Sequence, residues 1–306
     1  MPSLISLPDL AGAELDSIVD RAAKLADRSA VTPTLSGHSV GIYFRRTSTR
    51  TRTSFWRAAT GLGADVITFG QDDLQLCTGE SLGDTARVLS EYLDILVVRT
   101  NDDMAELREL DRHGELAIVN ALTSDEHPTQ ALADLVTLRE EFGELAGRHL
   151  LYLGEGNSSA RALVYATALV DALRLTMVTP PGYGLPDSVF ATAAELGGGP
   201  DRITQLHEIP ALDEPVDAVY TSRWQTMGVA KADPGWMPAF EPLRVTADLL
   251  DRVGAAHTVF LHDLPAVRGQ EVTDEVLDGP RSRAWRQSYH KMTSAMAVLE
   301  WCAGRL

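Results

Sequence analysis

Cysteine is scarce in this sequence of 306 residues: Cys77 and Cys302 stand far apart, and no CxxC or HExxH spacing is present. Two such cysteines cannot supply a disulfide framework, and the missing spacings remove the usual signs of a zinc site. The turn GEGNSSAR (154–161) also lacks the GxGxxG pattern and a ribose-binding acid, so a nucleotide is poorly supported there. We therefore predict no bound metal and no cofactor, and we interpret this turn as one wall of a substrate crevice.

Long apolar runs are missing as well. No segment approaches the ~20 uninterrupted apolar residues that a membrane span needs. The N-terminus MPSLISLPDLAGAELDSI lacks the basic start and the apolar block of a signal peptide. We expect a cytoplasmic protein without a membrane partner.

Positive charge is in deficit, because 43 acidic residues outnumber 27 basic ones and the net charge is -16. Such a chain is poorly suited to nucleic acid, which binds basic surfaces. A local basic cluster within an acidic protein instead suggests a small anionic ligand.

Apolar residues, at 44% of the chain, are numerous enough to bury a large core, and 306 residues correspond to about two domains. Short β-rich runs alternate with stretches of helical spacing. The predicted strands are residues 39–44, 64–70, 94–100, 117–122, 149–154, 174–180, 218–222 and 258–263. Helices are predicted over 9–30 and 79–93, after Pro128, and in the C-terminal SYHKMTSAMAVLEWCAG. This alternation predicts an α/β fold, with mostly parallel sheets covered by helices.

The segment FRRTSTRTRTSFWRAA (44–59) follows a predicted strand, carries five arginines and leads into residues suited to a helix. A strand that feeds a helix start leaves backbone N–H groups unpaired at the positive end of the helix dipole, where phosphate commonly binds. Side-chain donors there are Ser48, Thr49, Arg50, Thr51 and Arg52. The alternative interpretation is a helix cap beside a solvated basic patch.

Three further polar residues follow predicted strands. Arg99 stands at the end of the 94–100 strand, and His127 and Gln130 stand at a helix entrance beyond the 117–122 strand. At the carboxyl edge of a parallel sheet such side chains can face a ligand crevice. A lone arginine there can equally be a surface residue, and a lone histidine can be a cap or a packing residue. The similar position of the arginine-rich turn raises the alternative that all of them serve one site.

The motifs occur in one order: Ser48-Thr49-Arg50-Thr51-Arg52, Gln75, GESLGDTARVL (79–89), Arg99, His127-Pro128-Thr129-Gln130 and His262-Asp263-Leu264-Pro265. In this combination the chain resembles the aspartate and ornithine carbamoyltransferase family, nearer to its ornithine members, across nearly its whole length. The resemblance implies two α/β domains. Residues 1–141 with the C-terminal helix 286–306 would bind carbamoyl phosphate, and residues 142–285 would bind the amine. It also implies homotrimers with sites at subunit interfaces.

The resemblance further implies a role for each matched position. The phosphate of carbamoyl phosphate would be held by Ser48, Thr49, Arg50 and Thr51, with Gln75 reaching in from a neighbouring subunit. The carbamoyl group would be surrounded by Thr51, Arg99, His127 and Gln130. These residue types suit the chemistry, because the carbonyl oxygen gains negative charge as a neutral amine attacks its carbon, and hydrogen-bond donors stabilise that charge. The departing phosphate can accept the amine proton, so no dedicated protein base is required.

The amine-binding half departs from the ornithine pattern. Ser158 replaces a second asparagine, Ser222 an aspartate, Asp263 the thiol of the usual HCLP motif, and Lys291 an arginine near the C-terminus. Arg223 and Gln225 resemble the residues with which aspartate enzymes grip carboxylates, whereas the Thr226-Met227-Gly228 ending remains ornithine-like. The predicted acceptor-binding set is Asn157, Ser158, Ser222, Arg223, Thr226, Met227, Asp263, Leu264 and Lys291.

Three hypotheses follow for function. In the first, the chain carbamoylates an acceptor other than ornithine, such as 2,3-diaminopropionate or a modified amino acid of specialised metabolism, because Asp263 suits a cationic or hydroxyl-bearing acceptor. In the second it is an ordinary ornithine enzyme that makes citrulline. In the third it is a non-catalytic relative that binds carbamoyl phosphate. For Asp263 itself, the alternative is a purely structural carboxylate that pairs with Arg268 or caps a turn.

Overall fold

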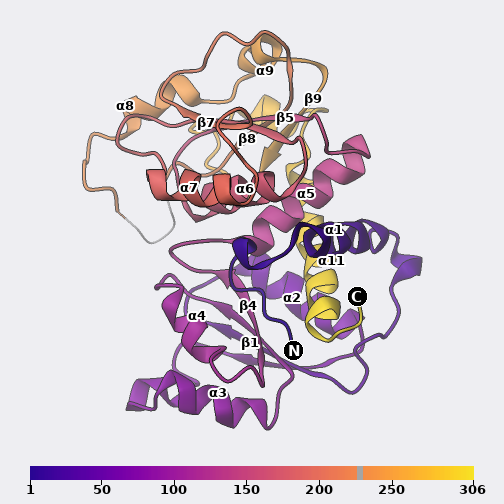
Figure 1. Ribbon diagram of the computed structural model, residues 1–306. Helices are drawn as coiled ribbons and strands as arrows, with labels where there is room; N and C mark the ends of the chain where they lie inside the picture. Colours follow the sequence, from indigo (N-terminus) through magenta and orange to yellow (C-terminus); the bar gives the residue numbers. More distant parts are fainter. Residues whose placement is uncertain (226–229) are drawn as a thin grey trace. The chain divides into compact units, whose positions relative to one another are not determined.

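The structure is a computed structural model that describes residues 1–225 and 230–306 (Figure 1). The chain divides into two compact units, Met1–Glu140 with Tyr289–Leu306, and Glu141–Ser288. Each unit contains its own sheet, and every strand pair in both sheets is parallel. The predicted α/β class is confirmed.

The first unit is built on a four-stranded sheet with the order β2-β1-β3-β4. Its strands are β1 (Ser39–Phe44), β2 (Asp65–Phe69), β3 (Ile95–Arg99) and β4 (Ala117–Leu122). The helices of this unit are α1 (Gly12–Lys24), α2 (Thr49–Gly61), α3 (Leu82–Ser90), α4 (Ala105–Leu110), most of α5 (Pro128–Phe142) and most of α11 (Ala284–Cys302). Short 3-10 turns are η1 (Leu7–Asp9), η2 (Arg28–Ala30) and η3 (Gln75–Thr78).

Burial explains why the strands of this sheet read differently in the sequence. All five residues of the interior strand β3 are buried, so it reads as a continuous apolar run. The edge strand β2 is exposed at three of its five positions. The C-terminal helix α11 lies beside α1, because Arg21 on α1 donates two hydrogen bonds, of 2.6 and 2.8 Å, to the buried carboxylate of Glu300. This ion pair fixes the end of the chain to its start.

The second unit is built on a five-stranded sheet with the order β7-β6-β5-β8-β9. Its strands are β5 (His149–Leu153), β6 (Arg174–Val178), β7 (Ile203–Leu206), β8 (Val216–Thr221) and β9 (Gly254–His262). Its helices are α6 (Ser158–Leu169), α7 (Asp187–Glu195), α8 (Met237–Phe240), α9 (Ala247–Val253) and α10 (Asp274–Leu277), with the 3-10 turn η4 (Glu241–Leu243). Its main core gathers apolar side chains from β5, β8, β9 and α9.

The structure differs from the sequence-based expectation in several elements, and helix α4 was not expected. The edge strand β7 was not expected, because it has only four residues and three of them are partly or fully exposed. The first predicted helix is shorter than expected, since α1 ends at Lys24 and the chain continues through η2. The predicted polar loop 71–79 contains η3. In the described part of the chain, no helix is long and apolar enough to cross a membrane.

Candidate active site

The arginine-rich turn connects β1 to α2, as the sequence predicted. Ser48 is the N-cap residue of α2 and has an extended backbone, with φ −156° and ψ 110°, but its side chain makes no capping hydrogen bond. The hydroxyl of Ser48 is therefore available to a ligand at the positive end of the helix. Thr49 is exposed, Ser48 and Arg50 are half-buried, and Thr51 is buried. The turn thus offers backbone and side-chain hydrogen-bond donors at the start of α2, and these side chains range from exposed to buried.

Arg99 reaches this turn from the neighbouring strand. In the parallel pairing of β1 with β3, Phe44 lies opposite Arg99, and the backbone N–H of Arg45 donates to the Arg99 carbonyl at 3.0 Å. The register of β3 against β4 shifts between Val98 and Arg99, an irregularity that re-aims the side chain. Arg99 Nη1 donates to Thr51 Oγ1 at 3.1 Å, and both side chains are buried. The structure therefore brings Arg99 and Thr51 together.

His127 lies at the entrance of α5, where only 4% of it is exposed. Burial lowers the pKa of His127 well below its ordinary value of 6.5, and the positive charges of Lys291 and Arg99 lower it further. The imidazole is therefore neutral at pH 7. Thr129 Oγ1 lies 3.4 Å from His127 Nδ1, which is a weak contact. A neutral imidazole has one N–H, so His127 can donate one hydrogen bond without adding a charge.

Gln130 lies one turn before Asp134 on α5, and α11 brings Lys291 to the same place. Gln130 Nε2 donates to Asp134 Oδ1 at 2.7 Å, and Lys291 Nζ donates to Gln130 Oε1. All three side chains are buried. Sequence reasoning placed Lys291 in the acceptor set, whereas the structure places it in the first unit, in contact with a predicted carbamoyl-binding residue. Asp134 was not predicted at all, although its spacing of four residues from Gln130 on a helix was visible.

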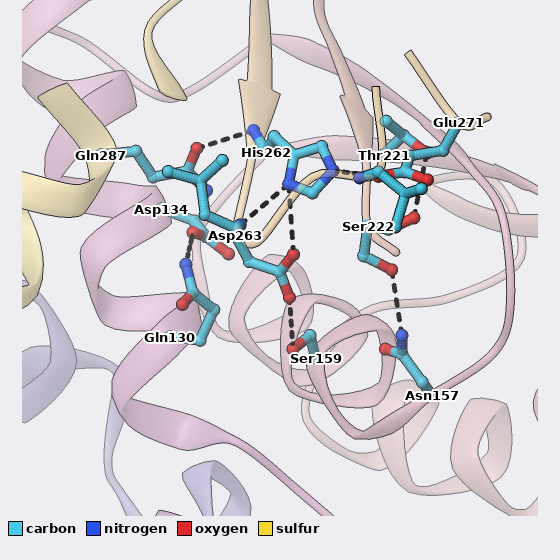
Figure 2. A network of polar contacts seen from close by, with 12 residues as sticks. Gln130, Asp134, Asn157, Ser159, Thr221, Ser222, His262, Asp263, Glu271 and Gln287 are labelled. Atoms are coloured by element: carbon cyan, nitrogen blue, oxygen red, sulfur yellow. Dashed lines mark hydrogen bonds and ion pairs between the residues drawn. The ribbon is translucent and has the colours of Figure 1, made fainter. Parts of the chain in front are cut away.

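The second unit brings together Asn157 and Ser222. Asn157 is the N-cap of α6, where its Oδ1 accepts from the Ala160 N–H at 3.0 Å. Its Nδ2 donates to Ser222 Oγ at 2.9 Å, as Figure 2 shows. Ser222 Oγ also lies 2.8 Å from the hydroxyl of Tyr152 and is buried. Ser158, which begins α6, is half-buried. These contacts make one polar group at the carboxyl ends of β5 and β8.

Asp263 directly follows β9, and its closest partner is a residue that the sequence analysis did not select. Ser159 Oγ donates to Asp263 Oδ2 at 3.0 Å (Figure 2). The alternative that Asp263 pairs with Arg268 is wrong. Arg268 Nη1 instead lies 2.6 Å from both Asp274 and Asp278. The Asp263 carboxylate is therefore held beside the first turn of α6.

His262 is fully buried next to Asp263. His262 Nδ1 accepts the Leu264 N–H at 2.8 Å and lies 3.5 Å from Asp263 Oδ1. Its Nε2 lies 3.2 Å from the buried carboxylate of Glu271. The backbone of Leu264 has φ 53°, which turns the chain immediately after Asp263. His262 is a structural support of this turn.

Two further predicted residues, Gln75 and Arg223, have other surroundings. Gln75 lies in η3, where it is exposed and its Oε1 accepts from Thr78 Oγ1 at 3.1 Å. Arg223 is half-buried, and its Nε has no hydrogen-bond partner among the described residues. Thr226 and Met227 lie outside the described residues, as does Gly228. No group of three or more metal-ligating side chains occurs within the described ranges.

The first unit thus carries an arginine-rich helix start, the buried pair of Arg99 and Thr51, and the buried His127 at another helix entrance, an arrangement that suits a phosphate-bearing ligand. Residues 3–140 match the family model of the aspartate/ornithine carbamoyltransferase carbamoyl-P binding domain, and residues 146–302 match that of the Asp/Orn binding domain. The chain belongs to the aspartate/ornithine carbamoyltransferase family and is a carbamoyltransferase.

Individual relatives agree with this assignment. The chain is 38% identical over 304 residues to the ornithine carbamoyltransferase of Gloeobacter violaceus, covering 97% of this chain and 94% of that protein. It is 39% identical over 300 residues to that of Haloquadratum walsbyi, covering 97% and 96%. Among solved structures, the ornithine carbamoyltransferase from Pyrococcus furiosus has a TM-score of 0.90 at 32% identity, covering 100% of this chain and 98% of that one. The Gloeobacter violaceus structure has a TM-score of 0.85 at 37% identity, covering 98% and 97%.

Proposed function

We propose that this chain transfers the carbamoyl group of carbamoyl phosphate to an amine of a small amino acid, giving a ureido product and phosphate. The observation that carries the proposal is the buried Arg99–Thr51 hydrogen bond at the start of α2, with a neutral His127 in the same unit. Phosphate would bind to Ser48, Thr49, Arg50 and Thr51, and the carbamoyl group to Thr51, Arg99, His127 and Gln130.

The proposed mechanism follows from these donors. The neutral amine forms a bond to the carbamoyl carbon, the bond from that carbon to the phosphate oxygen breaks, and phosphate leaves with the electron pair. Arg99, His127 and Thr51 donate to the carbamoyl oxygen as it gains charge, and removing one such donor commonly raises the barrier by about 3 kcal/mol. Arg50 and the helix start stabilise the departing phosphate, which takes the amine proton.

The first candidate acceptor is ornithine, because the relatives above are named ornithine carbamoyltransferases. A second candidate is a shorter diamino acid such as 2,3-diaminopropionate. It is favoured by the Asp263 carboxylate and by Ser222, which stand where ornithine enzymes have a thiol and an aspartate. Asp263 would then bind a cationic or hydroxyl-bearing group of the acceptor, while Asn157, Ser222 and Arg223 bind its amino acid end.

The proposal includes the assembly that the family resemblance implies. Residues 1–141 with 286–306 would bind carbamoyl phosphate and residues 142–285 the amine. Gln75 is exposed on η3, which suits a residue that acts in a neighbouring subunit of a homotrimer. Size-exclusion chromatography with light scattering tests this part, with a mass of three chains as the expected result and a monomer as the contradicting one.

The acceptor is tested by turnover of carbamoyl phosphate with ornithine and with 2,3-diaminopropionate, followed by phosphate release and the mass of the product. A kcat/KM for ornithine on the order of 10⁴ M⁻¹s⁻¹ or higher is typical of an enzyme on its own substrate and supports ornithine. A lower value for ornithine than for the shorter acceptor supports the second candidate. Absence of phosphate release above background with every amine contradicts the proposed transfer itself.

A further inference from the structure

The side-chain amide of Gln130 lies between two buried charges of opposite sign. Its Nε2 donates to Asp134 at 2.7 Å, and its Oε1 accepts from the Lys291 ammonium. Asp134 is 0% exposed, Gln130 1% and Lys291 6%, so water does not compete freely for these groups. Because α5 supplies two of the residues and α11 the third, the contact also joins two helices of the first unit.

These two neighbours allow the amide only one orientation. A glutamine amide is nearly symmetric in shape, but one end only donates hydrogen bonds and the other only accepts them. A carboxylate can only accept and an ammonium can only donate. Turning the Gln130 amide over would place its N–H groups against the ammonium and its oxygen against the carboxylate. Both contacts would then be lost in a buried site, where unpaired polar groups are costly.

The orientation matters because a carbamoyl group also has one accepting and one donating end. Arg99 can only donate, and Thr51 Oγ1 already accepts from Arg99. Both therefore suit the carbamoyl oxygen, which leaves the carbamoyl N–H groups in need of an acceptor. The oxygen of Gln130 has two lone pairs, so it can accept from a carbamoyl N–H while it keeps the Lys291 contact.

We propose that Asp134 and Lys291 are positioning residues that hold the Gln130 amide with its oxygen available to the carbamoyl N–H. Through this orientation the site distinguishes carbamoyl phosphate from phosphate alone. The inference rests on the proposed function, because it takes the carbamoyl group as the ligand of Gln130. Neither positioning residue needs to touch the substrate for this effect.

Equilibrium binding separates this role from catalysis. The probes are phosphonoacetamide, which carries both an amide and a phosphonate, and inorganic phosphate, which carries no amide. In Asp134→Asn, the new amide can donate or accept, so only Lys291 still favours one orientation of Gln130. In Lys291→Met the donor is lost, whereas Lys291→Arg keeps a group that only donates. A matched control is Thr137→Val, which alters another buried polar side chain of α5 that donates to Ala133.

The measured quantity is the ratio of the phosphate Kd to the phosphonoacetamide Kd. We expect Asp134→Asn and Lys291→Met each to lower this ratio by about tenfold, the size of one hydrogen bond to a buried group. Lys291→Arg and Thr137→Val should leave it within about twofold of the original ratio. A simple charge effect has a different signature, because removing Asp134 would then strengthen the binding of both probes and removing Lys291 would weaken both. That pattern, or an unchanged ratio in Asp134→Asn, overturns the proposal.

A Gln130→Met background completes the test. If Asp134 acts through Gln130, Asp134→Asn should not lower the ratio further in this background, and an equal further loss overturns the proposal. The outcome is distinguishable from a failure of the proposed function. If the unmodified protein does not bind phosphonoacetamide, the proposed carbamoyl phosphate site is contradicted. If it binds phosphonoacetamide and the variants leave the Kd ratio unchanged, only the positioning role is contradicted.

Discussion

The two units of this chain use polar side chains in different ways. In the first unit the predicted carbamoyl-binding residue Gln130 lies between two buried charges, Asp134 and Lys291. In the second unit the predicted acceptor residues are hydrogen-bonded to neutral side chains, Ser222 to Asn157 and Asp263 to Ser159. Removing one member of a buried pair of charges leaves the other charge unpaired, whereas replacing Ser222 or Asp263 leaves only a neutral partner behind. We therefore expect substitutions in the first unit to have the larger effects.

The largest expected effect is in the first unit, in Arg99→Met. This change removes the donor to Thr51, which is also the proposed donor to the carbamoyl oxygen, so kcat/KM should fall by about 10²- to 10³-fold with every amine. Phosphate release measures the effect, and circular dichroism verifies folding. A fall that depends strongly on which amine is used would contradict the assignment of Arg99 to the carbamoyl phosphate site.

His127→Asn should lower kcat by about 10²-fold, because in the proposed mechanism the imidazole N–H acts on charge that develops only in the transition state. The matched control is His149→Asn in the second unit, where His149 Nε2 lies 2.9 Å from Thr176 Oγ1. Both variants are compared for kcat and for thermal unfolding. A loss of stability at position 127 that accounts for the loss of turnover would make His127 a structural residue.

Asp263→Cys tests the second unit by restoring the thiol of the usual motif. We expect the ratio of kcat/KM for ornithine to that for 2,3-diaminopropionate to rise by about tenfold, while KM for carbamoyl phosphate stays unchanged. Arg268→Gln is the control, since Arg268 binds Asp274 and Asp278 and is exposed. An equal change of the ratio in both variants would show that Asp263 has no special part in choosing the acceptor.

A smaller effect concerns the dependence of stability on pH. The pKa of His127 is lowered by burial and by the Lys291 and Arg99 charges, so the unfolded chain binds more protons below pH 6.5. The stability that neutral His127 contributes is therefore present above pH 6.5 and is lost as the pH falls toward the folded pKa, by at most about 1.4 kcal/mol per pH unit. Denaturant unfolding at pH 7.5 and 5.5 should show a weaker pH dependence in His127→Asn. An identical dependence would contradict a neutral His127.

Local patterns were sufficient to predict the α/β fold and to select candidate site residues in the first unit. The runs that became β1 and β3 are buried and apolar, and Arg99, His127 and Gln130 follow strands at a sheet edge where ligands are expected. The edge strand β7 was not predicted because it is short and partly exposed. The contacts of Lys291 with Gln130 and of Ser159 with Asp263 join residues 161 and 104 positions apart, and no local periodicity reports such pairs. Only the folded chain shows them.

The central claim is that the first unit binds carbamoyl phosphate and the second unit selects the amine. The most direct test measures phosphate and ureido product together in the unmodified chain, Arg99→Met and Asp263→Cys, each with ornithine and with 2,3-diaminopropionate. The account predicts one phosphate per product, a similar loss with both amines in Arg99→Met, and a changed ratio between the amines only in Asp263→Cys. Phosphate release at background level in the unmodified chain, or a changed amine ratio in Arg99→Met, would contradict it.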